Sequence, residues 1–295
     1  AARRGWLTMY PEFNQNFTQV TTKTLDYAAS VDLIPEFKIE LTGLRNYTEN
    51  FSEQYDVSPD GTYNSRSPYS TGSFSISTIL LKSSFKHSDE FGSSAFNEFR
   101  GNRMIIANRM AEDYYGSTNF TRDAEGYPVG FGKNSQRVLL PAFVSAYTGF
   151  TTMHAGDGAQ KIGLGLFRDF PLPNWNIKYT GLMRLSFFKE NFKRFSISHS
   201  YKSTYTVNSF RSNLEYFLNP NDLDPSSNFR APILVGNVNL MEQFSPLARI
   251  DFEAKNSFNM AAELRKDRAL SLSFDNNLLT EVKGIEYIAK FGYRF

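Results

Sequence analysis

The sequence predicts an all-β fold: the wall of an antiparallel transmembrane β-barrel with about ten strands and a short helical insertion. Three observations lead to this prediction. Aromatic residues make up 16% of the chain, yet its mean hydropathy is negative, at −0.41. Apolar and polar residues alternate over long stretches, and short turn sequences separate these stretches. Transmembrane strands have such a composition because lipid-facing and lumen-facing side chains alternate along each strand.

The longest alternating stretch covers residues 249–264. One parity is apolar and is interrupted only by Asn256: Ile250, Phe252, Ala254, Phe258, Met260, Ala262 and Leu264. The other parity is polar and is interrupted only by Ala261. The period of two excludes a helix. It predicts one strand much longer than the usual soluble strand of about 5–6 residues. We expect Ser245-Pro246 to precede this strand as a turn and Lys266-Asp267-Arg268 to follow it.

Five other stretches alternate in the same way, at residues 25–33, 37–41, 74–80, 195–207 and 285–293. Between the first two, Ile34-Pro35-Glu36 predicts a tight turn. The polar segments 47–68 and 208–232 are expected to be long loops. Short turns at one end and long loops at the other are typical of outer-membrane barrels.

Residues 94–149 depart from the strand pattern and predict a helical insertion. Phe99, Ile106 and Met110 have helical spacing within residues 94–115, with Ser93-Ser94 as the N-cap. Residues 137–147 predict a second helix, which Pro141 starts or kinks. We therefore assign residues 1–295 to a transmembrane β-barrel segment and 94–149 to an insertion within it. Such an insertion lies either outside the bilayer or inside a wide lumen.

Bulk features exclude several other classes of protein. No stretch approaches the roughly 18 apolar residues of a membrane-spanning helix. Residues 1–6 lack the apolar region of a signal peptide, so we expect a processed terminus or a piece of a longer polypeptide. The 32 basic and 30 acidic residues are intermingled, which argues against nucleic-acid binding. The absence of cysteine removes disulfides, thiolate metal sites and cysteine nucleophiles.

No combination of residues predicts a catalytic, cofactor-binding or metal site, so we expect a protein that is not an enzyme. His199 lies between Ser198 and Ser200 in a predicted strand. Neighbouring strand residues point to opposite faces, so an interfacial histidine is favoured over a Ser–His nucleophile pair. His87 and His154 have no carboxylate or hydroxyl partner at a meaningful spacing.

Three weaker motifs have plain interpretations. Gly163-Leu164-Gly165 lacks the rest of a dinucleotide fingerprint, and we expect a strand that packs closely against a neighbour. Asp222 and Asp224 offer carboxylates for weak calcium binding, but a solvated loop is the favoured interpretation. Basic and aromatic residues at 189–195 indicate a strand end at a charged membrane surface rather than a nucleic-acid site.

Six groups of segments, in order along most of the chain, resemble one family of outer-membrane proteins. They are SAFNEF with NR (94–99, 102–103), VLLPAF with AYTG (138–143, 146–149), PLPNW with GL (171–175, 181–182), FSISHSY with STY (195–201, 203–205), EQFSPL (242–247) and GYRF (292–295). Together they resemble the SprA (Sov) family, the outer-membrane translocons of the type IX secretion system of Bacteroidetes.

The resemblance implies a piece of a very large single-chain barrel that exports folded proteins through a lumen with a lateral opening. It implies the outer membrane of a Gram-negative, Bacteroidetes-type bacterium. The implied partners are outer-membrane lipid, a PorV-like partner barrel, a periplasmic plug protein, secreted cargo proteins and other type IX secretion components, without nucleic acid. It also implies further strands after the GYRF motif, so Phe295 is not interpreted as a barrel-assembly signal.

The alternative is a free-standing, porin-like channel for small solutes, because about ten strands can close alone and their polar parity would again face water. The expected helical insertion, the missing signal peptide and the family resemblance argue against it. A barrel enzyme would need a nucleophile or a carboxylate pair near a strand end, and a TonB-dependent receptor would need a plug domain. The sequence indicates neither feature.

Overall fold

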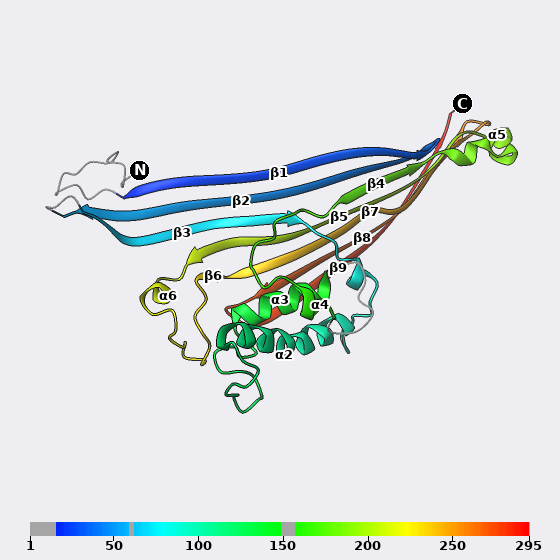
Figure 1. Cartoon of the computed structure of the whole chain (residues 1–295). Helices are drawn as coiled ribbons and strands as arrows, with labels where there is room; N and C mark the ends of the chain where they lie inside the picture. The colour runs from blue at the N-terminus through cyan, green and yellow to red at the C-terminus, as the bar shows by residue number, and fades with distance from the viewer. Residues whose placement is uncertain (1–15, 59–61, 149–156, 295) are drawn as a thin grey trace.

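A computed structural model of the chain describes residues 16–58, 62–148 and 157–294. Its strands form one antiparallel sheet of nine strands (Figure 1). The main order is β1-β2-β3-β5-β7-β8-β9, and outside this order β4 pairs with β2 and β5, and β6 pairs with β5. The strands are β1 (Phe17–Ile34), β2 (Phe37–Val57), β3 (Tyr63–Ser77), β4 (Asn174–Tyr179), β5 (Phe192–Ser212), β6 (Ile233–Val235), β7 (Asn237–Ala254), β8 (Phe258–Ser273) and β9 (Leu278–Tyr293). The prediction of a mainly antiparallel β fold is thus confirmed.

β3 and β4 occupy the same place in the sheet, between β2 and β5. β3 pairs with residues 45–57 of β2 and 204–211 of β5. β4 pairs with residues 37–42 of β2 and 197–201 of β5. The helical segment therefore interrupts one strand position, and the chain leaves the sheet after Ser77 and returns at Asn174.

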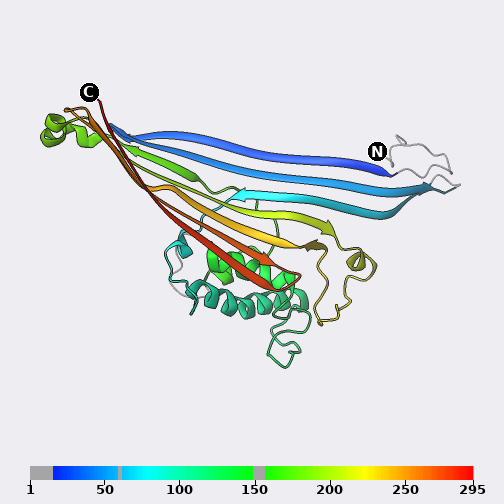
Figure 2. The same cartoon turned by 180° about the vertical axis from the view of Figure 1, so that it is seen from behind.

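The segment between β3 and β4 contains α1 (Leu81–Ser84), α2 (Ser94–Tyr115), α3 (Gln136–Tyr147) and α4 (Asp157–Lys161). A 3-10 helix, η2 (Gly181–Arg184), and α5 (Ser186–Asn191) join β4 to β5 at one end of the sheet, and α6 (Leu214–Leu218) follows β5. Both views show α2 and α3 together beside the middle of the sheet (Figures 1 and 2). Within the described residues, no helix is both long and apolar enough to cross a membrane.

α2 spans the range that its spacing predicts. Its N-cap is Ser93, whose Oγ accepts a hydrogen bond from the Phe96 N–H at 3.2 Å. It ends at Gly116, which has a left-handed φ of 65° and so permits the helix to stop without a Cβ penalty. α3 begins at Gln136, one residue before the predicted start, and Pro141 lies inside it.

α2 and α3 pack on the sheet through one continuous hydrophobic core. Phe99 and Ile106 of α2 and Phe143 of α3 belong to the same buried cluster as side chains from the middle of the sheet. The sheet side chains are Phe74, Ile76, Tyr205, Val207, Phe210, Val235, Val238, Leu240, Leu270 and Leu272. This core fixes the insertion on one face of the sheet.

The predicted single strand at residues 249–264 is wrong, because this stretch is a hairpin. β7 ends at Ala254, β8 begins at Phe258, and Phe252 pairs with Met260. Even-numbered residues of β7 pair with even-numbered residues of β8, so the apolar parity continues unchanged through the turn. Asn256, the one polar residue on the apolar parity, lies in that turn.

The turns predicted on either side of that stretch are also wrong. Lys266-Asp267-Arg268 lies in the middle of β8. Ser245-Pro246, joined by a cis peptide bond, lies within β7 where the pairing is irregular between Phe244 and Ala248. A bulge accommodates a proline inside a strand position, because the ladder is already interrupted there.

The polar segment 47–68 is mostly strand rather than loop. β2 continues to Val57 and β3 begins at Tyr63. Polar residues occupy both parities of this stretch, so the alternation that indicates a strand is hidden. In segment 208–232, β5 continues to Ser212 before α6 and a loop follow. The tight turn at Pro35-Glu36 is confirmed, with Glu36 at φ 73°.

Candidate functional site

One face of the sheet carries an exposed apolar band near the end that holds α5 and the turns at Pro35 and Asn256. Cross-strand pairing aligns its members on a single face. They are Phe37, Ile39, Ile177, Tyr179, Phe195, Ile197, Ile250, Phe252, Met260, Ala262, Leu264, Tyr287, Ala289 and Phe291. None of these side chains is buried. Tyr287 is 80% exposed and Phe291 is 65% exposed, so this apolar band is uncovered.

Aromatic rings concentrate at the turn end of the apolar band and contact one another across strands. Phe195 of β5 stacks on Phe252 of β7, with ring centroids 6.0 Å apart. Phe258 of β8 lies 6.4 Å from Phe291 of β9. The ring centroids of Phe252 and Phe258 lie 6.2 Å apart and join the two pairs, so these contacts link four strands into one aromatic row.

The opposite face at the same level carries a ladder of alternating charges, which we call the charge ladder. Its members are Lys193, Arg194, Arg249, Asp251, Glu253, Glu263, Arg265 and Glu286, from β5, β7, β8 and β9. Arg249 donates to Asp251 and to Glu263, both at 3.0 Å. Arg265 pairs with Glu263 and, at 3.1 Å, with Glu286 of the next strand. Each carboxylate therefore has a cationic neighbour.

The insertion lies on the same face as the apolar band. β8 shows this directly, because its even-numbered residues share one face over the whole strand. Ala262 and Leu264 belong to the apolar band, whereas Leu270 and Leu272 lie in the core under α2 and α3. The sequence left open on which side of the sheet the insertion lies, and the register answers that question.

A buried polar cluster, which we call the clamp, joins α1 to the sheet between the apolar band and the core. Arg268 of β8 and Glu242 of β7 form an ion pair with 3.1 Å between Nη2 and Oε2. Their side chains are only 4% and 1% exposed. Arg268 also donates to the backbone oxygen of Ser83 at 3.0 Å and to its hydroxyl at 2.8 Å.

Glu242 has two further partners in the clamp. Its Oε1 accepts hydrogen bonds from the Tyr201 hydroxyl at 3.0 Å and from the Ser84 hydroxyl. Sequence reasoning missed this cluster, although a signal was present. Glu242 lies on the apolar parity with Leu240 and Phe244, and a charge on the apolar parity of a strand indicates a specific buried partner.

A second ion cluster holds α2 against α1. Glu98 of α2 pairs with Lys82 at 2.6 Å and with Lys86 at 2.9 Å. Lys82 also donates to the backbone oxygen of Ser145 in α3 at 2.7 Å. Burial raises the pKa of the Glu98 carboxyl, but hydrogen bonds and charge from the two lysines lower it more, so the pKa is lowered overall.

The two edges of the sheet have no partner strand within the described part of the chain. β1 pairs only with β2, and β9 pairs only with β8. These edges are 18 and 16 residues long. A long edge presents unpaired N–H and C=O groups, which are a template for pairing with another strand.

The histidines singled out in the sequence do not form a catalytic arrangement in the described residues. Nδ1 of His199 lies 2.7 Å from the backbone oxygen of Leu247, and its ring lies near those of Trp175 and Phe244. His87 does have a carboxylate partner, Asp89 at 3.1 Å, which the sequence interpretation overlooked. His154 lies outside the described residues.

The weaker motifs lie apart from one another. Gly163-Leu164-Gly165 belongs to no strand, so the expected strand there is wrong. Asp224 accepts hydrogen bonds from the N–H groups of Ser226 and Asn228 and so closes its own loop. No group of three or more histidine or acidic residues in the described ranges could hold a metal ion.

No protein-family model matches this sequence, and no curated protein matches it.

Proposed function

We propose that this chain is part of the wall of an outer-membrane β-barrel that conducts folded proteins, the translocon of a type IX secretion system. One observation carries the membrane part of this proposal: an exposed apolar band on one face of the sheet stands directly behind a charge ladder on the other. The charged face is stable in water, whereas the exposed apolar face is costly in water, and contact with lipid would remove that cost.

The dimensions of the apolar band fit a bilayer. On β9 the exposed apolar side chains of this face extend from Ile285 to Tyr293, a length close to the about 9–11 residues that a tilted strand needs to cross the hydrocarbon core. The aromatic row at the turn end of the apolar band would correspond to the girdle of aromatic residues found at membrane interfaces. Strands such as β2, with 21 residues, are longer than this and would extend beyond the bilayer.

The two ends of the sheet suggest an orientation. Outer-membrane barrels have short turns on the periplasmic side and longer loops outside the cell. The turns at Pro35 and Asn256 would then be periplasmic, and the insertion would be extracellular. Because the insertion shares a face with the apolar band, it would lie on the outer surface of the wall rather than in the lumen.

Two features favour a large translocon over a small porin-like channel. Within the described residues the outer edges of β1 and β9 are unpaired, and further strands on both sides, which a large barrel supplies, would cover them. The resemblance to the SprA family supplies the cargo class, folded proteins, and the partners named above. The charge ladder would line the conduit and keep it wet.

The membrane part is tested with single-cysteine variants, because the chain has no cysteine of its own. Ala261 and Ala262 are neighbours on β8 that point to opposite faces, so they make a matched pair. A fluorophore at position 262 should be quenched by brominated lipid, and one at 261 should not. Equal quenching at both positions would contradict the proposal.

The translocon part is tested separately in the source organism. A photo-crosslinking residue at position 261 should form adducts with secreted proteins, whereas one at 262 should not. The polypeptide that carries this sequence should also be several times heavier than 33.7 kDa. If the chain is complete at that mass, gives no protein adducts and conducts small solutes, the porin-like alternative replaces the translocon.

A further inference from the structure

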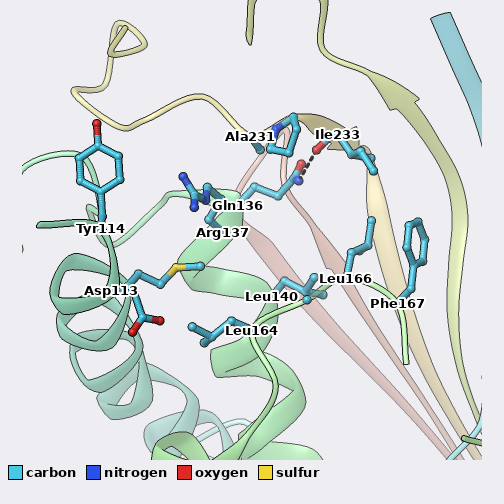
Figure 3. A pocket seen from close by; sticks show the side chains of 13 residues that line it. Asp113, Tyr114, Gln136, Arg137, Leu140, Leu164, Leu166, Phe167, Ala231 and Ile233 are labelled. Atoms are coloured by element: carbon cyan, nitrogen blue, oxygen red, sulfur yellow. Dashed lines mark hydrogen bonds between the residues drawn. The ribbon is translucent and has the colours of Figure 1, made fainter. Parts of the chain in front are cut away.

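A cavity of about 570 Å³ opens where the insertion meets the loop before β6 (Figure 3). α2, α3, the segment at residues 164–167 and the segment at 231–233 enclose it. Its walls are largely apolar, formed by Met110, Leu140, Leu164, Leu166, Phe167 and Ile233. Ligand cavities in proteins commonly measure about 300–1,000 Å³ and combine apolar walls with a few polar groups.

Most polar groups at this cavity already have partners. The side chain of Gln136 donates to the backbone oxygen of Ile233 at 2.8 Å and accepts from the N–H of Val235 at 2.9 Å. The Tyr114 hydroxyl donates to Asn221 at 3.2 Å. Asp113 is exposed, and in Figure 3 its carboxylate points away from Arg137.

Arg137 is the exception. Within the described residues its guanidinium makes no ion pair, and its central carbon lies over the face of the Phe131 ring, 5.3 Å from the centroid. Nearby cations differ: Arg109 donates to two backbone oxygens, and Arg230 pairs with Glu215 at 3.3 Å. Burial lowers the pKa of Arg137, and nearby tyrosines oppose this effect.

We propose that this cavity binds an amphipathic organic anion, whose carboxylate or phosphate head group pairs with Arg137 and whose aliphatic body lies against Leu140, Leu164 and Leu166. A guanidinium presents two parallel N–H groups that match either head group. Arg137 lies in the first turn of α3, where the helix dipole adds positive potential. A purely apolar molecule would occupy the cavity but would leave the Arg137 guanidinium without an anionic partner.

The test is titration calorimetry on the purified protein, kept soluble by an amphipathic polymer so that no detergent competes for the cavity. Four probes share one chain length: octanoate, octyl phosphate, octanol and octyltrimethylammonium. Octanoate or octyl phosphate should bind, octanol should bind more weakly, and the cation should not bind. Whichever anion binds more tightly identifies the head group as carboxylate or phosphate.

Three variants complete the test. Arg137→Met should weaken anion binding about tenfold to a hundredfold, the range expected for a hydrogen bond to a charged group, and should leave octanol binding unchanged. Arg100→Met removes an exposed arginine from α2 and serves as the matched control. Gly165→Leu should block all the probes, because a Cβ there meets nothing closer than 3.9 Å and the side chain can extend into the cavity.

Two results would overturn the proposal. One is equal affinity of octanoate and octyl phosphate for the wild type and for Arg137→Met. The other is anion binding that survives in Gly165→Leu while that variant keeps the wild-type melting temperature. If Arg137→Met fails to fold, the Gly165→Leu result decides alone.

Discussion

Replacing Arg268 by methionine should release α1 from the sheet and weaken the whole attachment of the insertion. The substitution removes the ion pair with Glu242 and both hydrogen bonds to Ser83. It also leaves the Glu242 carboxylate, 1% exposed, without its cation. Breaking a buried ion pair by removing one partner costs about 3–5 kcal/mol, because the remaining charge is uncompensated.

A double-mutant cycle separates the energy of the Arg268–Glu242 ion pair from the cost of a simple packing defect. In Glu242→Met/Arg268→Met no charge remains, so part of the lost stability should return, with a coupling energy of about 1–3 kcal/mol. Recovery should be incomplete, because Tyr201 and Ser84 lose their acceptor. The matched control is Arg249→Met in the charge ladder, where the arginine side chain is 35% exposed and the expected cost is below about 1 kcal/mol.

Native-state hydrogen exchange measures this effect locally, because the opening free energy of α1 and of the adjoining part of β7 can be followed in the folded protein. A loss of about 3–5 kcal/mol corresponds to a fall in protection of roughly 2–4 orders of magnitude. The reasoning is refuted if Arg268→Met changes the protection of α1 no more than Arg249→Met does, or if the double variant is as unstable as the sum of the single variants.

Three other perturbations follow from the same structure. Ala262→Arg should destabilise the protein in a bilayer by about 2–4 kcal/mol, and Ala261→Arg by no more than about 1 kcal/mol. Chemical unfolding in lipid vesicles measures both costs, and equal costs would contradict a lipid-facing apolar band. Gly72→Ala should lower the free energy of unfolding by about 1–3 kcal/mol, because the new Cβ would lie 2.1 Å from the backbone oxygen of Thr48. In Gly101→Ala on α2 the new Cβ meets nothing within 4 Å, so this variant should stabilise the helix by about 0.5–1 kcal/mol. Thermal melts of both variants check these two predictions. The lowered pKa of Glu98 adds stability above its ordinary value of 4.5, and this stability is lost as the pH falls through the lowered pKa. Melting temperatures below pH 4.5 should therefore fall more steeply in the wild type than in Glu98→Gln, and parallel pH curves would count against the Lys82–Glu98–Lys86 cluster.

The alternation of apolar residues predicted which residues share a face better than it predicted where strands begin and end. Ile250, Phe252, Met260 and Ala262 do share one face, as their parity predicts. The turn at residues 255–257 was missed because the hairpin pairs even residues with even residues, so the pattern is identical for one strand and for two. Only the lapse at Asn256 marked the turn.

Other parts of the fold depend on contacts that sequence spacing cannot show. Residues 47–52 pair with both β1 and β3, and residues 54–57 pair with β3, so their strand character comes from pairing and not from an apolar face of their own. Residues 74 and 174 are far apart in the chain, yet β3 and β4 share one place between the same two strands. The cavity at Arg137 likewise needs α2, α3 and the segment at 231–233 to meet, which no local pattern records.

The distribution of charge along β8 bears on where a bilayer would end. On the face of the apolar band, Met260, Ala262 and Leu264 are followed by Lys266 and Arg268, and then by the core under the insertion. A charge facing hydrocarbon is costly, so the first charged residue on this face would mark the limit of a lipid-facing surface. Lys266 donates to the backbone oxygen of Ser84 at 2.6 Å and lies 4.2 Å from the Phe85 ring centroid, which places its ammonium group against α1 rather than in lipid. The clamp thus begins where the apolar band stops. In the proposed membrane arrangement, β8 would face lipid from Met260 to Leu264, and it contacts the insertion from Lys266 onward.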